Sequence, residues 1–178
     1  IRLMCYNQEK LIAKAMNGIM MQKTDFKVEV VVGDDFSTDN TLKIIRKIKN
    51  TETIHIKILE RIVGDSYWEK RRELGRLYNF TNILDNCTGK YIALLDGDDY
   101  WTDPLKLQKQ VDFLEENGDY AICGALVKCL IVEGDNKEFS DGFFSNTKTT
   151  LTTEDFLSGY PMHTSSVLFR RYMLQLPG

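Results

Sequence analysis

The sequence predicts an α/β fold with a mostly parallel central sheet and helices on both faces. Segments patterned like strands alternate with segments spaced like amphipathic helices at least three times in residues 1–120, which is typical of such sheets. Residues 28–32 form a nearly continuous β-branched run, which indicates a strand covered on both faces. Acidic clusters also follow two of the predicted strands, where open α/β sheets bind their ligands.

The first predicted unit is a strand over residues 1–5, a loop and an amphipathic helix. Apolar residues recur at helical spacing in this helix: Leu11, Ile12, Ala15, Met16 and Ile19. The second unit is the strand over residues 28–32, a polar loop and a helix with apolar positions Leu42, Ile45 and Ile48. Ser37 or Thr38 is expected to cap that helix.

The third predicted strand covers residues 54–59, where apolar and polar residues alternate. A charged helix is expected to follow over residues 69–86, and Thr88-Gly89 is its stop signal. Residues 91–95 are almost entirely apolar and predict the fourth strand.

Asp103 and Pro104 predict the start of a further helix, with Asp at the cap and Pro in the first turn. Its expected buried stripe is Leu107, Val111 and Leu114. The remaining chain is expected to form a strand, a polar connection, a short helix and a final strand: residues 120–132, 133–150, 154–157 and 165–169. No repeat and no second domain are visible, so residues 1–178 are expected to form a single domain.

Composition narrows the functional classes. The net charge is −3 and the sequence pI is about 5.5, which argues against a dedicated nucleic-acid binder. Four cysteines without CxxC spacing and two histidines disfavour a structural zinc site and fit a reducing compartment. No apolar run reaches the length of a membrane span. A basic run, Lys70-Arg71-Arg72 with Arg76, either holds a phosphate or forms a solvated helix face.

The two acidic clusters are the main functional signal. Asp34 and Asp35 follow the second predicted strand, and Asp96, Asp98 and Asp99 follow the fourth. Carboxylates gathered at one sheet edge repel one another unless a cation or a hydrogen-bonding ligand lies between them. Mg²⁺ and Mn²⁺ take oxygen ligands and keep waters and phosphate oxygens in their shell, so one or two carboxylates are enough. We expect Gly97 to allow a sharp turn there and to leave room for a ligand.

A structural role for these acids is the alternative. Asp is common at strand ends and helix caps, and Asp99 or Asp103 could serve only in that way. A DxD pattern alone is weak evidence, but one directly after an apolar strand, with a second Asp pair after an earlier strand, is more specific. A calcium loop of the EF-hand type is disfavoured, because counting from Asp96 places Trp101 at position six and Leu107 at position twelve.

Three stretches occur in the order and roughly the spacing of one known family: CYNQEKLIAKAM, VEVVVGDDFSTDNTLKII and GKYIALLDGDDYWTDPLKLQKQVDFLEENGDY. On these stretches, which cover most of residues 1–120, the chain resembles the family 2 glycosyltransferases. The resemblance implies the GT-A fold, which is Rossmann-like and is shared by nucleotide-diphospho-sugar transferases. Residues 1–100 would be the nucleotide-binding half and residues 101–178 the start of an acceptor-side half.

The implied function is that of a metal-dependent, inverting glycosyltransferase. It would move a sugar from a nucleotide-sugar donor, with a UDP-sugar expected, to a hydroxyl of a carbohydrate or lipid-linked acceptor. This activity would serve bacterial surface polysaccharide or glycan synthesis. The expected location is cytoplasmic or peripheral at the inner face of the cell membrane. No nucleic-acid partner and no transmembrane segment in this chain are expected.

The resemblance also implies roles for single residues. Asp35 would bind the base of the nucleotide, Asp98 would ligate Mn²⁺ or Mg²⁺, and Asp96 would bind the ribose or share the metal. Tyr6 would lie against the nucleotide. Asn7 and Glu9, in the same loop, would also bind the nucleotide, although Glu9 also suits the first turn of a helix. Arg72 or Arg76 would reach the base or the diphosphate. Asp34 is expected to orient its loop.

Acceptor-side roles are implied for His163 and Trp101, with packing as the alternative for both. An inverting transfer needs a general base, which this family places well beyond the DxD motif. Asp155 is the last acidic residue, so no base is found in this chain. We therefore expect the sequence to be truncated at its C-terminal end. Truncation is also expected at the N-terminal end, where the first strand lacks its usual upstream residues.

Two other functions remain open. A non-catalytic module that binds a nucleotide or a divalent cation would explain the missing base. A sugar-phosphate nucleotidylyltransferase is less favoured, because the loop over residues 6–9 contains no glycine for a phosphate-binding turn.

Overall fold

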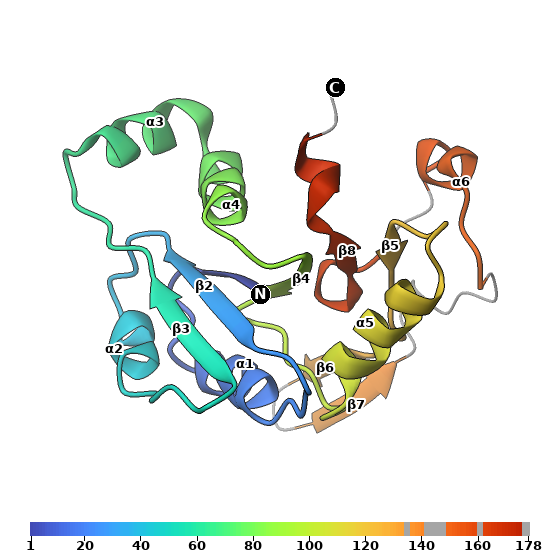
Figure 1. The fold of residues 1–178 in the computed structure, drawn as a ribbon. Coiled ribbons are helices and arrows are strands. Elements are labelled where there is room, and N and C mark those ends of the chain that lie inside the picture. Colours follow the sequence, from blue (N-terminus) through green and yellow to red (C-terminus); the bar gives the residue numbers. More distant parts are fainter. Residues whose placement is uncertain (134–135, 141–148, 160–161, 176–178) are drawn as a thin grey trace.

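A computed structural model describes residues 1–133, 136–140, 149–159 and 162–175. Its centre is a six-stranded sheet of order β3-β2-β1-β4-β8-β5 (Figure 1). These strands are β1 (Arg2–Cys5), β2 (Val28–Asp34), β3 (Ile54–Ile58), β4 (Tyr91–Asp96), β5 (Ile122–Cys123) and β8 (Leu168–Arg170). The first four strands are mutually parallel, while β8 runs antiparallel to β4 and β5. The expected α/β class with a mostly parallel sheet is confirmed.

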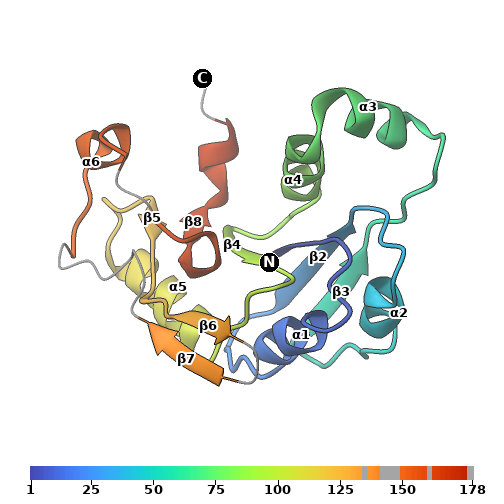
Figure 2. The ribbon, with the colours of Figure 1, turned by 180° about the vertical axis from the view of Figure 1, so that it is seen from behind.

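Helices cover both faces of this sheet (Figures 1 and 2). On one face, α1 (Ile12–Met20), α2 (Thr41–Ile45) and α5 (Lys106–Glu116) contribute to one buried cluster with side chains of the sheet. On the other face, α4 (Arg76–Asp85) packs its buried Ile83 and Leu84 into a second cluster. The helix α3 (Ser66–Leu74) lies beyond α4 on that side. Alternate residues of β2 enter opposite clusters, as expected for a strand covered on both faces.

The strand register brings the two acidic clusters to one edge. Cys5 of β1 is opposite Asp34 of β2, and Met4 is opposite Asp96 of β4. The ladder continues into the loops, because the Asp35 amide donates to the Cys5 carbonyl and the Gly97 amide to the Met4 carbonyl, each at 2.9 Å. The loops after β1, β2 and β4 therefore start side by side.

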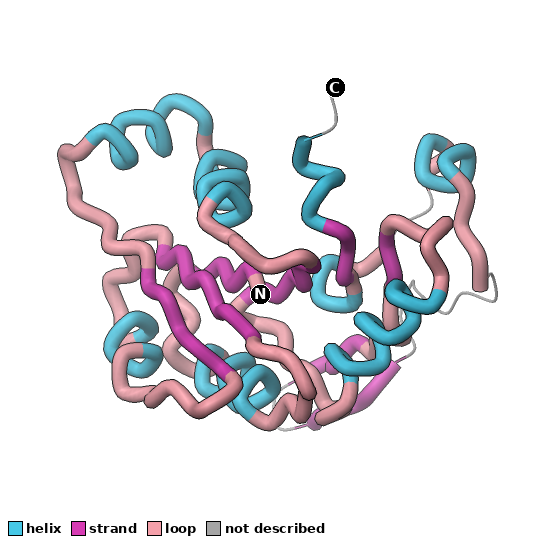
Figure 3. Tube along the Cα trace, in the orientation of Figure 1, coloured by secondary structure: helices cyan, strands magenta, loops and turns pink. Residues whose placement is uncertain are grey.

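The charged helix expected over residues 69–86 is in fact two helices, and the prediction of one was wrong (Figure 3). The break is at Gly75, whose φ of 71° lies in the left-handed region that glycine tolerates best. Because the chain turns here, α3 and α4 point in different directions (Figure 3). This turn decides which of the basic side chains face the sheet edge.

Two expected caps are also wrong. The residue before α2 is Asn40, and Ser37 instead bonds to Asp34. The helix expected from Asp103 and Pro104 begins at Lys106, because the Asp103 carboxylate accepts from the Leu105 amide at 2.8 Å and holds a turn there. The expected stripe of α5 holds, with Leu107 and Leu114 buried.

The second half departs furthest from the sequence prediction. Residues 120–132 form two separate strands, β5 and β6 (Cys129–Glu133), and β6 pairs with β7 (Asn136–Ser140) in a hairpin inside the expected polar connection. Residues 134–135 and 141–148 of that connection lie outside the described residues. The short helix α6 (Thr153–Leu157) is as expected.

The expected final strand over residues 165–169 is shifted to β8, because a 3-10 turn, η2 (Thr164–Ser166), precedes it. A last 3-10 segment, η3 (Arg171–Gln175), follows β8. None of the helices within the described ranges has the length and apolar character needed to span a bilayer.

Candidate functional site

A cavity of about 530 Å³ opens at the carboxyl edge of the sheet, beside the end of β2. Its lining comes from the loops after β1 and β2 and from α3 and α4: Tyr6, Asp35, Phe36, Trp68, Arg71, Arg72 and Arg76. Aromatic faces suit a planar base, and guanidinium groups suit a base carbonyl or phosphate oxygens. The structure thus brings together four predicted site residues, namely Tyr6, Asp35, Arg72 and Arg76.

The centre of this cavity is an ion pair that the sequence did not reveal. The Arg71 Nε atom donates to both oxygens of Asp35 at 2.8 and 2.9 Å, and Nη2 donates to Oδ2 at 2.6 Å. The Asp35 side chain is 7% exposed and that of Arg71 is 24% exposed. The hydrogen bonds to Asp35 raise the pKa of the Arg71 guanidinium. Arg71 belongs to the basic run noted in the sequence, but the single helix predicted there gave no reason to expect that Arg71, among these basic residues, would contact Asp35.

The position of α3 over the cavity is set by Tyr67 and Asn79. The buried Tyr67 hydroxyl donates to Asn79 Oδ1 at 2.9 Å, and Asn79 Nδ2 donates to the Gly33 carbonyl of β2 at 3.1 Å. Burial raises the pKa of Tyr67 to about 12, so the hydroxyl stays a donor. A side chain at Gly33 would lie 2.4 Å from Ile83 and 2.8 Å from Asn79 Oδ1, so glycine is what allows α4 to come this close.

Two residues with a left-handed backbone lie at the cavity, where Phe36 is part of the lining and Asn7 is next to the lining residue Tyr6 in sequence. Asn7 has a φ of 50° and Phe36 a φ of 63°, and they are the non-glycine residues with positive φ in the described part of the chain. Asn tolerates this conformation, whereas a bulky aromatic residue rarely adopts it. Each one directly follows a cavity residue, Tyr6 or Asp35. Backbone strain of this kind tends to gather at binding sites.

Asn7 and Glu9 bond to the loop after β2 rather than line the cavity. Asn7 Oδ1 accepts from the Thr38 amide at 2.8 Å. Glu9 Oε2 accepts from the amide and the side chain of Asn40 at 3.0 and 2.9 Å. These bonds fasten the loop after β1 to the loop after β2. Direct nucleotide contact by Asn7 and Glu9 therefore stays a prediction, while their part in shaping the site is visible.

The expected loop-orienting role of Asp34 is confirmed. Asp34 is 4% exposed, and its two oxygens accept from the Ser37 amide at 2.9 Å and from the Ser37 hydroxyl at 2.5 Å. The Cys5 thiol also lies 3.6 Å from Oδ1. The adjacent Asp34 and Asp35 thus do different things, because consecutive side chains point to opposite sides of an extended chain.

The three acids after β4 are in three different environments. Asp96 is paired through Oδ1 with Nη1 of Arg2 at 2.5 Å. Asp98 is exposed and forms no hydrogen bond or ion pair within the described ranges. Burial raises the pKa of the Asp99 carboxyl, while the neighbouring His163 and Ser165 act in the opposite direction. Asp98 is therefore the acid that is free to meet a ligand from solvent.

This arrangement fits a divalent ion that the protein holds only in part. Among the described residues, no cluster of three or more His, Cys, Asp or Glu side chains could hold a metal by itself. Mg²⁺ and Mn²⁺ do not need such a cluster, because they are commonly bound by one or two carboxylates together with substrate phosphates and waters. Asp98 suits that role. Asp96 suits it less well, since one of its oxygens already faces a guanidinium.

Gly97 is required for packing rather than for an unusual backbone angle. It does not belong to the glycines with positive φ. A Cβ atom there would lie 2.4 Å from Gln8 Oε1, 2.9 Å from Ile12 and 3.0 Å from Cys5. The expectation that this glycine leaves room for a ligand is wrong, because the room is taken by the start of α1.

Trp101 does not offer a ring face to a sugar, which corrects the acceptor-side expectation. The residue is 6% exposed, and its Nε1 atom donates to the Ser165 carbonyl at 2.7 Å. The Lys106 ammonium lies 4.3 Å from the centre of the ring. At Gly18 of α1, a Cβ atom would lie 2.8 Å from backbone atoms of Trp101. Trp101 therefore fastens the loop after β4 to the core.

His163 lies near the acidic cluster and caps a turn. Its Nδ1 atom accepts from the Ser165 amide at 3.3 Å and lies 2.7 Å from the Ser165 hydroxyl. The same atom is 3.9 Å from Asp99 Oδ2, which is too far for a hydrogen bond. The side chain is 28% exposed, so its position next to the cluster is accessible. A role toward the acceptor stays a prediction.

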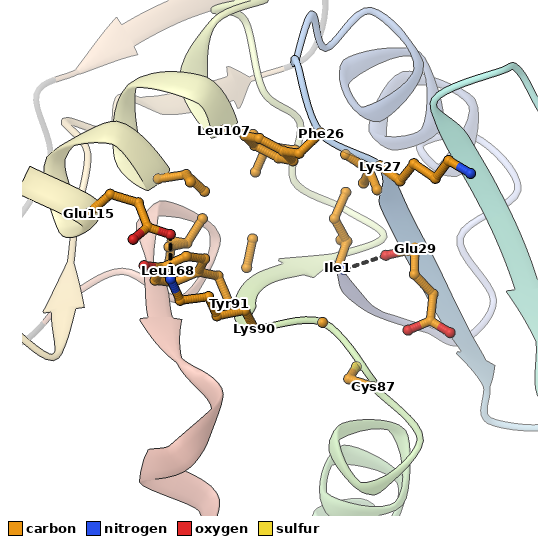
Figure 4. A pocket seen from close by; sticks show the side chains of 14 residues that line it. Ile1, Phe26, Lys27, Glu29, Cys87, Lys90, Tyr91, Leu107, Glu115 and Leu168 are labelled. Carbon is orange, nitrogen blue, oxygen red and sulfur yellow. Dashed lines mark hydrogen bonds and ion pairs between the residues drawn. The ribbon is translucent and has the colours of Figure 1, made fainter.

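A second cavity, of about 270 Å³, lies at the opposite edge of the sheet, where β1, β2 and β4 begin (Figure 4). Its walls are mainly apolar, with Phe26, Leu107 and Leu168 among them, and the Lys90–Glu115 ion pair lies at its margin. Ligands of open α/β sheets bind beyond the carboxyl ends of the strands. The acidic and basic side chains singled out above lie at that other edge.

Comparison with known proteins agrees with this geometry. Rv1520 of Mycobacterium tuberculosis, an uncharacterised protein, is 34% identical over 167 residues, which are 93% of this chain and 45% of Rv1520. The glucosyltransferase WfaP of Escherichia coli, named as acting with UDP-Glc on α-D-GlcNAc-diphosphoundecaprenol, is 33% identical over 115 residues, 65% of this chain and 40% of WfaP.

Among solved structures, TarS of Staphylococcus aureus in complex with UDP-GlcNAc matches 98% of this chain and 46% of the TarS chain, with a TM-score of 0.63 and 26% identity. The fold is therefore GT-A-like, as expected. The chain spans less than half the length of these three proteins. The sequence model of the family described as "Glycosyl transferase family 2" matches residues 1–175, and the chain belongs to this family.

Proposed function

We propose that this chain is the donor-binding part of a metal-dependent, inverting glycosyltransferase. It transfers a sugar from a nucleotide-diphosphate donor, with a UDP-sugar as the donor class, to a hydroxyl of a carbohydrate or lipid-linked acceptor. One observation carries the proposal. On the same sheet edge, an aromatic and cationic cavity around the Asp35–Arg71 pair lies beside the end of β2. Asp98, which has no hydrogen-bond or ion-pair partner among the described residues, follows β4 on the other side of β1.

In this proposal the base enters the cavity beside β2. Tyr6, which is 54% exposed, lies against the ring of the base. The Asp35 carboxylate offers hydrogen-bond acceptors to this base, and the Arg71 guanidinium offers donors. A pyrimidine such as uracil offers an N–H and carbonyl oxygens to such a pair. The names of two relatives support uridine nucleotides, since WfaP is named for UDP-Glc and TarS was solved with UDP-GlcNAc.

The diphosphate then extends along the sheet edge toward the acids after β4. Asp98 would hold Mn²⁺ or Mg²⁺ there, and the ion would supply positive charge against the leaving diphosphate. Asp96 ends β4, two positions before Asp98, and is suited to the ribose. Residues 101–178 would begin the acceptor side, with His163 at the border. The general base is not assigned to a residue of this chain.

Calorimetric titration of the 178-residue chain with UDP, GDP and dTDP, each with and without Mn²⁺, tests the donor site. We expect UDP to bind in the presence of Mn²⁺ and to lose most of its affinity without it. GDP and dTDP serve as matched controls for the base and the ribose. A chain that is folded but binds none of the three nucleotides contradicts the proposal.

The non-catalytic module is a second candidate, because the cavity around Asp35 and Arg71 can bind a nucleotide without any group that acts as a general base. Nucleotide binding does not separate it from an enzyme. Release of UDP from UDP-GlcNAc or UDP-Glc in the presence of Mn²⁺ does, because a pure binding module leaves the sugar bond intact. Release that is lost in Asp98→Ala contradicts the non-catalytic reading.

A further inference from the structure

Among the described residues, Arg2 is the charged residue with the least exposed surface. Arg2 lies in β1, between β2 and β4, and is 0% exposed. Its Cζ atom lies 4.5 Å from the centre of the Phe80 ring of α4. A buried guanidinium is costly unless a counter-charge lies beside it.

Asp96 is that counter-charge. Nη1 of Arg2 donates to Oδ1 of Asp96 at 2.5 Å, whereas Nε and Nη2 have no hydrogen-bond partner among the described residues. The Asp96 side chain is 29% exposed, so the pair joins a fully buried cation to an anion at the edge of the site. Arg2 thereby fixes one oxygen of Asp96 and leaves the other for a ligand.

From this geometry we infer that Arg2 is a positioning residue. It keeps Asp96 available to bind the ribose of the nucleotide and prevents Asp96 from coordinating the metal ion. The inference rests on the proposed function. A divalent cation on Asp96 would lie within a few ångströms of a guanidinium that water does not screen, and the two positive charges would repel each other. A ribose hydroxyl is neutral and donates to the free oxygen without that repulsion.

The charge count agrees with this division. Asp96, Asp98 and Asp99 together carry three negative charges when ionised, and Arg2 neutralises one of them. The two that remain, Asp98 and Asp99, are the carboxylates that a divalent ion can meet here without drawing on Asp96.

The test compares UDP with 2′,3′-dideoxy-UDP in the presence of Mn²⁺, together with the Mn²⁺ concentration that gives half-maximal UDP binding. In the wild-type chain, UDP should bind about tenfold more tightly than the dideoxy analogue, as for a hydrogen bond to a charged group. In Arg2→Met, Asp96 is released to the cation. The preference should fall below about threefold, and half-maximal binding should need about tenfold less Mn²⁺, because a second carboxylate joins the shell.

Two further variants make the outcome specific. Arg2→Lys keeps the positive charge and should retain most of the wild-type preference. Phe80→Leu removes the aromatic ring beside the Arg2 guanidinium, at a partly exposed position. It should shift the ribose preference and the Mn²⁺ requirement in the same direction as Arg2→Met does. Phe80→Leu therefore tests the inference even if Arg2→Met does not fold. Ile83→Ala, a buried change on the same helix, is the control for lost stability.

A preference ratio is insensitive to the fraction of folded protein, so a purely structural role of Arg2 leaves it unchanged. An unchanged ratio and Mn²⁺ requirement in the folded variants overturns the inference, as does a wild-type chain that binds UDP without any ribose preference. A wild-type chain that binds no UDP overturns the proposed function and the inference with it.

Discussion

The Arg71 guanidinium contacts both carboxylate oxygens of Asp35, through three hydrogen bonds of 2.6 to 2.9 Å. This contact joins the end of β2 to α3, across 36 positions of sequence. The positive charge of Arg71 on α3 balances the negative charge of the buried Asp35 carboxylate, which also lines the cavity. The cavity is therefore formed in advance of any ligand, which lowers the cost of ordering it on binding.

Replacing Arg71 with Met should lower the free energy of unfolding by about 1–3 kcal/mol, because it leaves a nearly buried carboxylate without its donors. Urea unfolding at pH 7 measures this change. Arg72→Met is the matched control, since Arg72 is an exposed neighbour on the same helix and should change stability by less than about 0.5 kcal/mol. Equal effects of the two substitutions would contradict the structural importance of the pair.

Asp98→Ala should abolish the metal-dependent part of UDP binding without changing the fold. Asp98 is exposed and forms no hydrogen bond or ion pair in the described part of the chain, so its loss has little effect on packing. Calorimetry with and without Mn²⁺, together with circular dichroism, checks both halves of this statement. Full Mn²⁺-dependent affinity in the variant would remove Asp98 from the metal site.

Asp35→Ala should weaken UDP binding both with and without Mn²⁺, because its proposed contact is with the base. We expect a loss of at least about tenfold, as for a hydrogen bond to a charged group. The comparison with Asp98→Ala distinguishes a base contact from a metal contact. If Asp35→Ala lost affinity only in the presence of Mn²⁺, its assignment to the base would be wrong.

Lys106 predicts a pH dependence of stability. Burial under Trp101 lowers its pKa from 10.5 to about 8. Between these two values the unfolded chain binds more protons than the folded chain, so the contribution of Lys106 to stability rises with pH and is most unfavourable below pH 8. From pH 7 to pH 10, the wild type should gain roughly 2–3 kcal/mol relative to Lys106→Met.

Urea unfolding of both proteins across that range measures the difference, and the subtraction removes the titration of other groups. Lys109→Met is the control, because the Lys109 side chain on the same helix is 63% exposed. A difference between the wild type and Lys106→Met that stays flat with pH would show that burial does not affect this amine.

The sheet and the acidic edge could be predicted because they rest on local patterns. The β-branched run before Asp34 and the apolar run before Asp96 specify buried strands, and parallel strands bring their ends together. The role of Arg71 as the partner of Asp35 could not be predicted, because its position depends on the turn at Gly75. A single glycine in a charged segment does not by itself indicate a left-handed backbone conformation. The family resemblance implied roles for several residues, but it did not indicate that Arg71 would pair with Asp35.

Arg2 and Trp101 show a different limit. In the sequence, Arg2 interrupts an apolar strand and gives no sign of its partner, which lies 94 positions away. In the sequence, the position of Trp101 two residues after DGDD suggests a ring on which a sugar stacks. Only the packing of Gly18 and Lys106 against Trp101 shows that this ring is buried. Long-range contacts decide both cases, and no local period in the sequence encodes them.

The insertion of β8 beside β4 has a consequence for synthesis of the chain on the ribosome. A nascent chain that has emerged only as far as α5 already contains β1 to β4, but the outer edge of β4 still lacks its neighbour. The Trp101 side chain also lacks its acceptor, the Ser165 carbonyl, which arrives 64 positions later. Until then β4 exposes unpaired backbone groups that can pair with another chain. Nascent chains that end before β8 thus expose an edge that can aggregate, and the loop after β4 gains its Trp101–Ser165 contact only when the segment with β8 has emerged.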